Sequence, residues 1–308
     1  MKPSFYGLLF AISTTVLIVF SNDAKAQNIK LIAPSPPGVV IDIAARLIAI
    51  HVAKISGQTP VVENRPGADG LIGIGIVAKS PKNENIYGLL TAGTFEALRH
   101  PNNLSLNIQD IQPITLIGIS GLVIAVPASA STKTIEELVQ LGKTKTLSAG
   151  ALGENSISHK CITIFSNIAG IRPPNIQHYK GFAPLVTDLM TGNLEYSCVA
   201  EHLFSRFSHR LTPLAVTLPD PSSFLPNVPT LEMKGIQGVP VGDWMMLVMP
   251  RNANSQAANA LVSNLRKVFS SDSVFRNRML EIYIHLLPPS DIGPEIAENF
   301  LRRQISQP

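Results

Sequence analysis

The chain has 308 residues, 45% of them hydrophobic and 15% charged, which fits one large or two ordinary globular domains with a full apolar core and excludes a disordered protein. Aromatic residues make up only 6%, and the lysines and arginines are scattered, so the composition argues against a protein that binds nucleic acid. A formal net charge of +4 is compatible with small anionic molecules as ligands.

The first 26 residues (1–26) have the pattern of a secretory signal peptide. Met1 and Lys2 give a positive start, Leu8–Phe20 is apolar, and the sequence NDAKAQ supplies an A-x-A cleavage site after Ala26. A single membrane anchor is the alternative interpretation, but the apolar run is short for a bilayer. We therefore expect this segment to be removed on export.

Strands and helices alternate along the next part of the chain. Prolines and glycine in SPPG end the first strand, and apolar residues then recur at helical spacing. The predicted strands are Ile29–Ala33, the start of TPVVENRPGADG, YGLLTAG, and one or two strands in QPITLIGISGLVIAVPAS. The predicted helices are Ile41–Lys54, LIGIGIVAKS and TIEELVQLGK, the last with Thr134 as its N-cap.

The same alternation continues to the end of the chain. The predicted strands are TLSAG, NIQHY, LEYSCVA, LTPLAVTL and VGDWMMLVMP. The predicted helices are SISHKCITIFSNIAG, which Gly170 ends, then APLVTDLMTG, SQAANALVSNLRKVFSS and PEIAENFLRRQIS. Strands that alternate with helices of this length predict an α/β fold with parallel sheets.

Four loops that lead from strands to helices are the candidate binding elements. In open α/β sheets, ligands bind beyond the carboxyl ends of the strands. Helix N-termini there offer unpaired N–H groups, which attract anions. The four loops are Ser35–Val40, Ala92–Thr94, Gly153–Ser158 and Tyr179–Phe182. If the first pair faces the second pair across a cleft, the site suits a small oxyanion, with a carboxylate as the obvious candidate.

The sequence offers little support for catalysis. It contains no P-loop, no H-E-x-x-H and no G-x-S-x-G, and its close glycines do not form a dinucleotide fingerprint. Ser156 and His159 have no orienting carboxylate that the sequence identifies, so a capping serine and an ordinary helix histidine are favoured over a catalytic pair. Glu201, His202 and His209 fit no standard metal spacing and predict a solvated charged loop. We expect no catalytic residue, no metal site and no cofactor.

Asp42 and Arg46 are four residues apart on the first helix, which permits an ion pair. Asp42 either orders the anion-binding loop or simply benefits from the helix dipole, and the two interpretations are compatible. Lys180 can supply positive charge to a carboxylate, although a lysine on a loop is more often only solvated. Trp244 and Tyr179 can wall the cleft or belong to the core.

Two cysteines, Cys161 and Cys198, remain in the exported chain. They can form a disulfide in an oxidising compartment. The alternative is two separate buried thiols, which behave as small hydrophobic groups. We favour the separate thiols, because nothing in the sequence brings the two residues together.

Several segments, in order along the chain, resemble the tripartite tricarboxylate transporter substrate-binding family, also called Bug receptors. These are APSPPGVVIDIAARLIA, PVVENRPGADGLIGIGIVAKS, HYKGFAPLVTDLMTGNLEY, LPNVPTLEMKGIQG and DWMMLVMP. The resemblance implies a two-lobed periplasmic binding protein, type II-like, in which each lobe is a mostly parallel sheet flanked by helices. It implies one domain built from residues 27–121 and 243–308 and a second built from 122–242.

The resemblance also implies a function. The protein is expected in the periplasm, where it captures a small carboxylate (a di- or tricarboxylate, an acidic amino acid or an aromatic acid) between its lobes. It then presents this ligand to the integral-membrane permease subunits of a tripartite transporter, without catalysis and without binding nucleic acid, as a monomer. The implied ligand-binding residues are Ser35, Pro36, Pro37, Gly38, Val39, Asp42, Gly93, Thr94, Asn155, Ser156, Ser158, Tyr179, Lys180, Gly181 and Val199.

The chain departs from the family pattern inside these loops. Val39 and Val40 replace glycine, Val199 replaces a frequent aspartate, and Ala151 and Leu152 replace serines. β-Branched residues resist positive φ and crowd the ligand face, and a lost hydrogen bond costs about 1–3 kcal/mol. The ligand is then bound weakly, is less polar than usual, or is absent, as in an orphan or decayed receptor with a sensing role. A cryptic α/β hydrolase is the remaining alternative.

The expected mechanism is closure of the two lobes around the ligand. The resemblance implies that two segments cross between the lobes, so the hinge is predicted near Leu122–Pro127 and Gly242–Pro250. Binding would then shift an equilibrium between open and closed forms.

Overall fold

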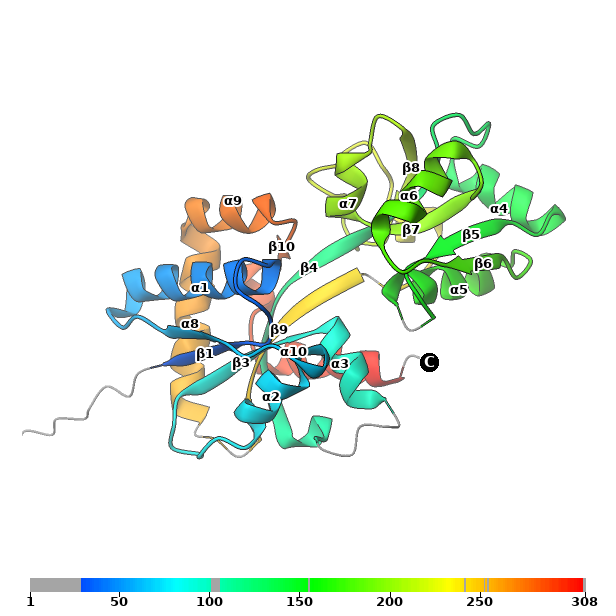
Figure 1. The fold of residues 1–308 in the computed structure, drawn as a ribbon. Helices are drawn as coiled ribbons and strands as arrows, with labels where there is room; N and C mark the ends of the chain where they lie inside the picture. The colour runs from blue at the N-terminus through cyan, green and yellow to red at the C-terminus, as the bar shows by residue number, and fades with distance from the viewer. Residues whose placement is uncertain are drawn as a thin grey trace, which may run out of the picture.

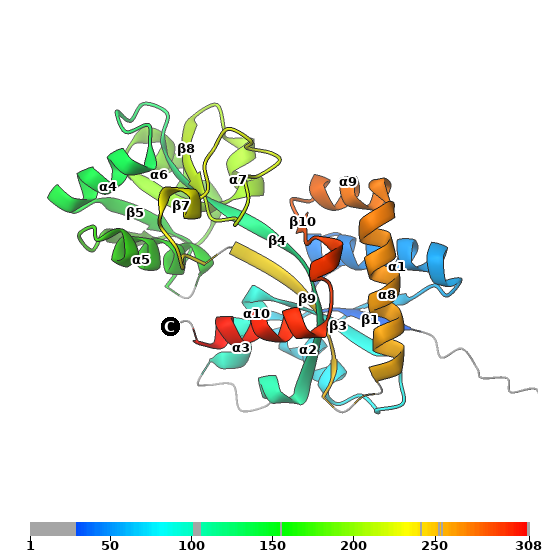
Figure 2. The same cartoon turned by 180° about the vertical axis from the view of Figure 1, so that it is seen from behind.

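A computed structural model describes residues 29–100, 106–154, 156–240, 242–251, 253 and 255–306, so the expected signal peptide lies outside the described residues. The molecule consists of two α/β lobes that two long strands connect (Figure 1). The view from behind shows the same division, with α8, α9 and α10 in one lobe and α4 to α7 in the other (Figure 2). Among the residues described, no helix combines the length and the apolar character needed to cross a bilayer.

The first lobe is built from both ends of the chain. Its sheet has the order β2-β1-β3-β9-β4, with β10 paired to β4. β1 is parallel to β2 and β3, whereas β9 is antiparallel to β3 and β4. Its strands are β1 (Lys30–Ala33), β2 (Val61–Asn64), β3 (Ile86–Thr91), β4 (Ile111–Pro127), β9 (Gly242–Pro250) and β10 (His285–Leu286). Its helices are α1 (Val40–Ser56), α2 (Leu71–Ala78), α3 (Ala92–Arg99), α8 (Ser255–Ser271), α9 (Ser273–Glu281) and α10 (Pro294–Ser306), with short 3-10 turns at Ala68–Gly70, Ile108–Asp110 and Pro289–Asp291.

The second lobe is formed by the middle of the chain. β4 continues into its sheet, which has the order β4-β7-β5-β6, with β8 also paired to β4. β5 is parallel to β6 and β7, whereas β4 is antiparallel to β7 and β8. The α/β class is confirmed, and in each lobe antiparallel pairs made by the connecting strands join the predicted parallel ones. Its remaining strands are β5 (Ser148–Ala151), β6 (Asn175–His178), β7 (Tyr196–Ala200) and β8 (Leu211–Val216). Its helices are α4 (Ile135–Thr144), α5 (Ile157–Ala169), α6 (Phe182–Thr191) and α7 (Glu201–Arg206), followed by a 3-10 turn at Glu232–Lys234.

One strand joins the two sheets. β4 is a single strand, and it pairs with β9 from Ile111 to Gly121 and with β7 from Leu122 to Ala125. The change of partner therefore falls between Gly121 and Leu122. The predicted domain boundaries fall at this change of partner. That each lobe is an independent domain stays a prediction.

Apolar faces of the helices cover both sides of the sheets. α1 and α8 pack together on the first lobe and bury Ala45, Ile48 and Leu265 against the sheet. α4 and α5 bury Leu138 and Phe165 in the second lobe. Apolar side chains three or four residues apart lie on one face of a helix, and it is this face that each helix packs into the core.

The helix ends follow the local rules of capping. Thr134 caps α4, as predicted, and its Oγ1 accepts the Glu137 N–H at 3.2 Å, which forms a capping box with Glu137. Gly170 ends α5 in the left-handed region at φ 64°, also as predicted.

The preference for two separate thiols is wrong. Cys161 of α5 and Cys198 of β7 form a disulfide, with their Cα atoms 6.2 Å apart. Both side chains are buried in the core of the second lobe, where α5 packs against β7. Thirty-seven positions separate them in sequence, so only the tertiary fold shows that they meet.

Two predicted loops are helical instead. Ala92–Thr94 forms the first turn of α3, because Thr91 caps that helix by accepting the Thr94 N–H through its Oγ1 at 3.3 Å. Glu201 and His202 begin α7, and Glu201 is buried rather than solvated. α9 was not predicted from the sequence, and its N-cap, Asp272, accepts the Phe275 N–H at 3.0 Å.

Candidate functional site

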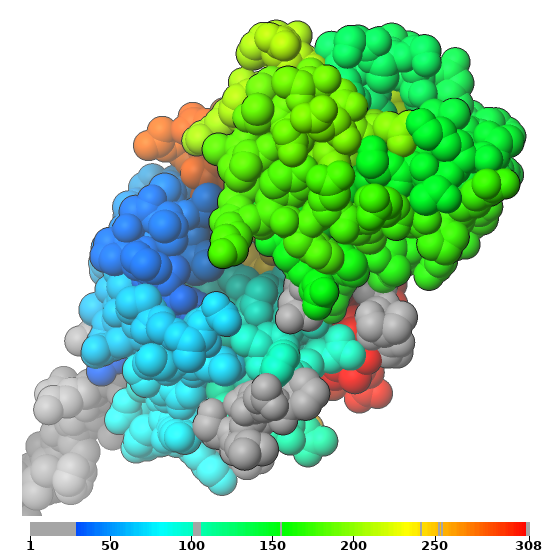
Figure 3. Space-filling model, turned by 45° about the vertical axis from the view of Figure 1, so that its right-hand side comes forward, coloured from blue at the N-terminus to red at the C-terminus, as the bar shows by residue number. Residues whose placement is uncertain are grey.

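A cavity of about 380 Å³ lies beside the strands that connect the lobes. The first lobe supplies its loops and strand ends, and α7 supplies His202 from the second lobe. Figure 3 shows the first lobe's N-terminal part (blue) and the second lobe (green) flanking a hollow. The cavity is lined by Val39, Val40, Ile41, Thr91, Gly93, Gly118, Ser120, His202, Asp243, Trp244, Met245, Ile282 and Ile284.

The loop Ser35–Val40 reaches this cavity with its last two residues. Pro36 and Pro37 prevent further strand pairing, and Gly38 takes a left-handed φ of +83°, which its lack of a side chain permits. Val39 then has an extended backbone at φ −89°. The valines therefore fit this loop without strained backbone, and both remain exposed on the cavity wall.

Asp42 orders this loop from within α1. Its Oδ2 accepts the Gly38 N–H at 2.8 Å and the Arg46 Nε–H at 3.1 Å, and its Oδ1 accepts an Asn64 amide N–H at 2.9 Å. The hydrogen bond from Arg46 is the main reason that the pKa of Asp42 falls to about 2. Asn64 also donates to the Ser35 carbonyl at 3.1 Å. Asp42 thus acts behind the loop, and it is not part of the cavity lining.

Ser35 keeps one polar atom without a protein partner. Its side chain is 5% exposed, and no described residue hydrogen-bonds to its Oγ. Buried hydroxyls are normally paired, because desolvation of an unpaired one is costly. This hydroxyl at the start of the loop therefore has unused capacity for a hydrogen bond.

The second candidate loop contributes mainly through its backbone. Gly93 is exposed and lines the cavity together with Thr91. Thr94 is buried, and its Oγ1 lies 3.1 Å from the Thr91 Oγ1. The threonine hydroxyls thus bind each other at the start of α3.

The polar groups of the second lobe's β5–α5 loop bind within their own lobe. Ser156 caps α5 by accepting the His159 N–H, and its Oγ donates to the Gly153 carbonyl at 2.6 Å. Ser158 is buried, and its Oγ accepts the Leu152 N–H at 3.0 Å. This confirms the interpretation of Ser156 as a cap. Neither serine lines the cavity, and Asn155 lies outside the described residues.

The remaining predicted residues also lie apart from the cavity. The Tyr179 hydroxyl donates to Asp188 Oδ2 at 2.6 Å, and burial together with this hydrogen bond raises the pKa of Tyr179 to about 12. Lys180 is exposed, and Gly181 is half-buried ahead of α6. Val199 is 3% exposed and belongs to the apolar core behind β7. The structure therefore brings together the two loops of the first lobe, but not those of the second.

Several cavity residues were not predicted from sequence. Ile282 and Ile284 follow α9, and Gly118 and Ser120 lie on β4. Trp244, which the sequence offered as either wall or core, is both, because it lines the cavity and packs edge-on against Phe300. Asp243 is the one charged residue in the otherwise apolar strand VGDWMMLVMP, and this contrast is the sequence signal that could have identified it.

The cavity contains two titratable side chains of opposite type. The surrounding protein desolvates Asp243, although its side chain is open to the cavity, and this raises its pKa above 3.8. Burial is the main reason that the pKa of His202 is lowered, and Arg206 adds to it. No lysine or arginine is among the lining residues, so the wall is mostly apolar with one carboxyl group.

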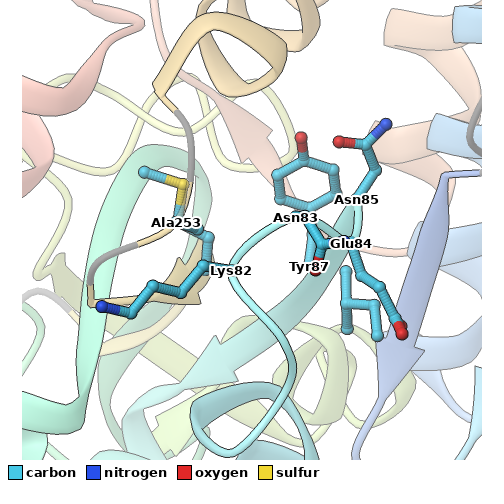
Figure 4. A pocket seen from close by; sticks show the side chains of 8 residues that line it. Lys82, Asn83, Glu84, Asn85, Tyr87 and Ala253 are labelled. Atoms are coloured by element: carbon cyan, nitrogen blue, oxygen red, sulfur yellow. The ribbon is translucent and has the colours of Figure 1, made fainter. Parts of the chain in front are cut away.

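A second, smaller cavity of about 110 Å³ lies far from this site, at the loop before β3 (Figure 4). Lys82, Asn83 and Ala253 line its rim, and Tyr87 contributes its ring. Burial raises the pKa of Tyr87 to about 12. The part of the chain that the structure describes contains no group of three metal-ligating side chains there or elsewhere.

The chain resembles a group of bacterial transport receptors. The model of the tripartite tricarboxylate transporter family receptor matches residues 44–281. The protein BugT of Bordetella pertussis is 27% identical over 282 residues, which cover 87% of this chain and 84% of BugT.

Solved structures share the two-lobed fold. A TctC solute-binding protein from Polaromonas, solved without ligand, has a TM-score of 0.82 at 23% identity and covers 92% of this chain and 96% of its own. An R. palustris protein solved with adipate has a TM-score of 0.68 at 23% identity and covers 92% of this chain and 95% of its own.

Proposed function

The chain belongs to the family of tripartite tricarboxylate transporter receptors, and from this we propose that it is a periplasmic receptor for a small carboxylate. It holds the ligand between its two lobes and presents it to the membrane permease of its transporter, without catalysis. The adipate bound to a protein of the same fold supports this ligand class.

The observation that carries the proposal is the start of α1 at the cavity wall. Val39, Val40 and Ile41 line the cavity, and they form the entry and first turn of a 17-residue helix. The first N–H groups of a helix have no acceptor inside it, and the helix dipole makes this end favourable for negative charge. The unpartnered Ser35 hydroxyl lies in the same loop, behind the residues that line the cavity. A carboxylate is the small anion that this combination suits.

The disulfide supports export to the periplasm. Disulfides persist in oxidising compartments and are rare in the bacterial cytosol. The Cys161–Cys198 bond therefore agrees with the signal-peptide pattern that the sequence shows at its N-terminus.

The hydrolase alternative has no support from the described geometry. Ser156 Oγ accepts the backbone N–H of His159 at 3.2 Å, whereas the His159 ring lies 3.0 Å from His178. A catalytic serine needs the ring of a histidine on its hydroxyl. The orphan-receptor alternative predicts the same fold with no ligand, so a measurement of ligand binding distinguishes it from the carboxylate receptor.

The test is ligand-induced thermal stabilisation of the exported protein. We expect at least one acid from a panel of mono-, di- and tricarboxylates, with adipate included, to raise Tm at millimolar concentration. The matched neutral amides should not raise it. If no acid in the panel changes Tm while the protein still unfolds cooperatively, the orphan-receptor hypothesis replaces this proposal.

A further inference from the structure

Asp243 is an unpaired carboxyl group in the proposed ligand cavity. It lies second in β9, and in the register of the sheet it is opposite Ser120 of β4, which also lines the cavity. Within the described chain, no hydrogen bond or ion pair engages its carboxylate. Its side chain is open to the cavity rather than folded into the core.

The rest of the cavity wall offers Asp243 no positive charge. His202 is the one other titratable group among the lining residues, and its pKa is lowered, so it is mostly neutral at pH 7. Val39, Val40, Ile282 and Ile284 supply apolar surface instead. An exposed carboxylate with no cationic side chain beside it on the cavity wall is free to pair with a positively charged group of a ligand.

This wall also selects against a second carboxylate on the ligand. A dicarboxylate held at the α1 N-terminus would bring its other end into a cavity with no lysine or arginine and with Asp243 present. Two like charges at short distance repel, and no lysine or arginine of the wall offsets this repulsion, so a dicarboxylate is disfavoured.

We propose that the ligand is a small zwitterion with an apolar body, such as an apolar α-amino acid, whose ammonium group pairs with Asp243. This rests on the proposed function, which places the carboxylate of the ligand at the start of α1. The ammonium then lies by Asp243 and Ser120, and the apolar side chain contacts the valines and isoleucines of the wall. Asp243 is in this account the residue that determines specificity.

The experiment compares ligands that differ by one charged group. Calorimetric titration of the exported full chain uses two pairs, leucine with 4-methylpentanoate and phenylalanine with 3-phenylpropanoate, and the amines 3-methylbutylamine and 2-phenylethylamine. Asp243→Asn keeps the shape of the side chain and removes its charge. Asp220→Asn, at an exposed position of the second lobe, is the matched control.

We expect at least one amino acid to bind about tenfold or more tightly than its partner without the amino group, since a charge-assisted pair is worth that much. Asp243→Asn should bring the two affinities within about twofold of each other, and Asp220→Asn should leave the preference unchanged.

Equal or tighter binding of the acid without an amino group overturns the role of Asp243 but is still consistent with a carboxylate receptor. If an amine binds tightly and neither acid without an amino group binds, the role of Asp243 is supported. The proposal that the protein binds its ligand through a carboxylate is then overturned. Binding of none of the six compounds overturns this inference, as does a preference that survives Asp243→Asn.

Discussion

Glu201 of α7 and His285 of β10 pair across the two lobes, with the Glu201 Oε2 and the His285 Nε2 at 2.7 Å. Glu201 is 1% exposed and also accepts a hydrogen bond from Ser222. The Tyr283 ring lies against Phe224 beside this pair, and its hydroxyl is 2.7 Å from the Ser205 hydroxyl. His202 and Ile284, the neighbours of the pair in sequence, line the cavity. This contact therefore connects the cavity wall to the relative position of the lobes.

Glu201→Gln is expected to lower the stability of the protein. The buried carboxylate serves both Ser222 and His285, and loss of a charged hydrogen bond costs about 1–3 kcal/mol. Thermal and urea unfolding measure the change. Glu232→Gln, at an exposed carboxylate of the second lobe, is the control and should behave as wild type. Equal stability of all three proteins would show that the Glu201 pair contributes nothing.

A second contact joins the lobes on the opposite side of β4 and β9 (Figures 1 and 2). The Lys160 Nζ of α5 lies 2.7 Å from the Glu96 Oε2 of α3. Lys160→Glu places two carboxylates there, and we expect the lobes to open, which small-angle X-ray scattering detects as a larger radius of gyration. The double exchange Glu96→Lys with Lys160→Glu should restore the wild-type value. Because the pair is partly exposed, its effect should be about 1 kcal/mol or less and should fade in high salt. Identical scattering from all variants would contradict a role in lobe closure.

Much of the fold follows from local sequence signals. Apolar spacing located the strands and most helices, and Thr134 and Gly170 set helix ends by their side-chain and backbone chemistry. Such signals work because each acts within about one helical turn. α7 was missed for the same reason, since Glu201 becomes buried only through partners 21 and 84 residues away.

The cavity could be predicted only in part. The loop at Val39 was identified because proline, glycine and a following helix are neighbours in sequence. Asp243 and Ile284 reach the same cavity through the return of the chain after the second lobe, which no local pattern shows. The polar loops at Ser158 and Tyr179 have the expected residues, but Ser158 binds the Leu152 N–H and Tyr179 binds Asp188, both within the second lobe.

Removal of the Cys161–Cys198 bond should destabilise the second lobe. A disulfide that closes a loop of this length contributes about 2–4 kcal/mol, mainly by restricting the unfolded chain. We expect a lower urea midpoint in dithiothreitol, and the double variant Cys161→Ala with Cys198→Ala should unfold early with or without reductant. Two titratable thiols in protein purified without reductant would contradict the bond.

Asp42 makes a further part of the stability dependent on pH. Its pKa in the folded protein is about 2, below the ordinary 3.8, so its carboxylate stabilises the fold above about pH 4 and this contribution is lost as the pH falls toward 2. Asp42→Asn removes the charge-assisted bonds to Gly38 and Arg46, and we expect it to cost about 1–3 kcal/mol at pH 7. The difference in unfolding free energy between wild type and variant, measured by urea from pH 7 to pH 2, should shrink across the acid range. Other carboxylates titrate equally in both proteins and cancel in this difference. A difference that stays constant down to pH 2 would mean that Asp42 holds the Ser35–Val40 loop by shape and not by its charge.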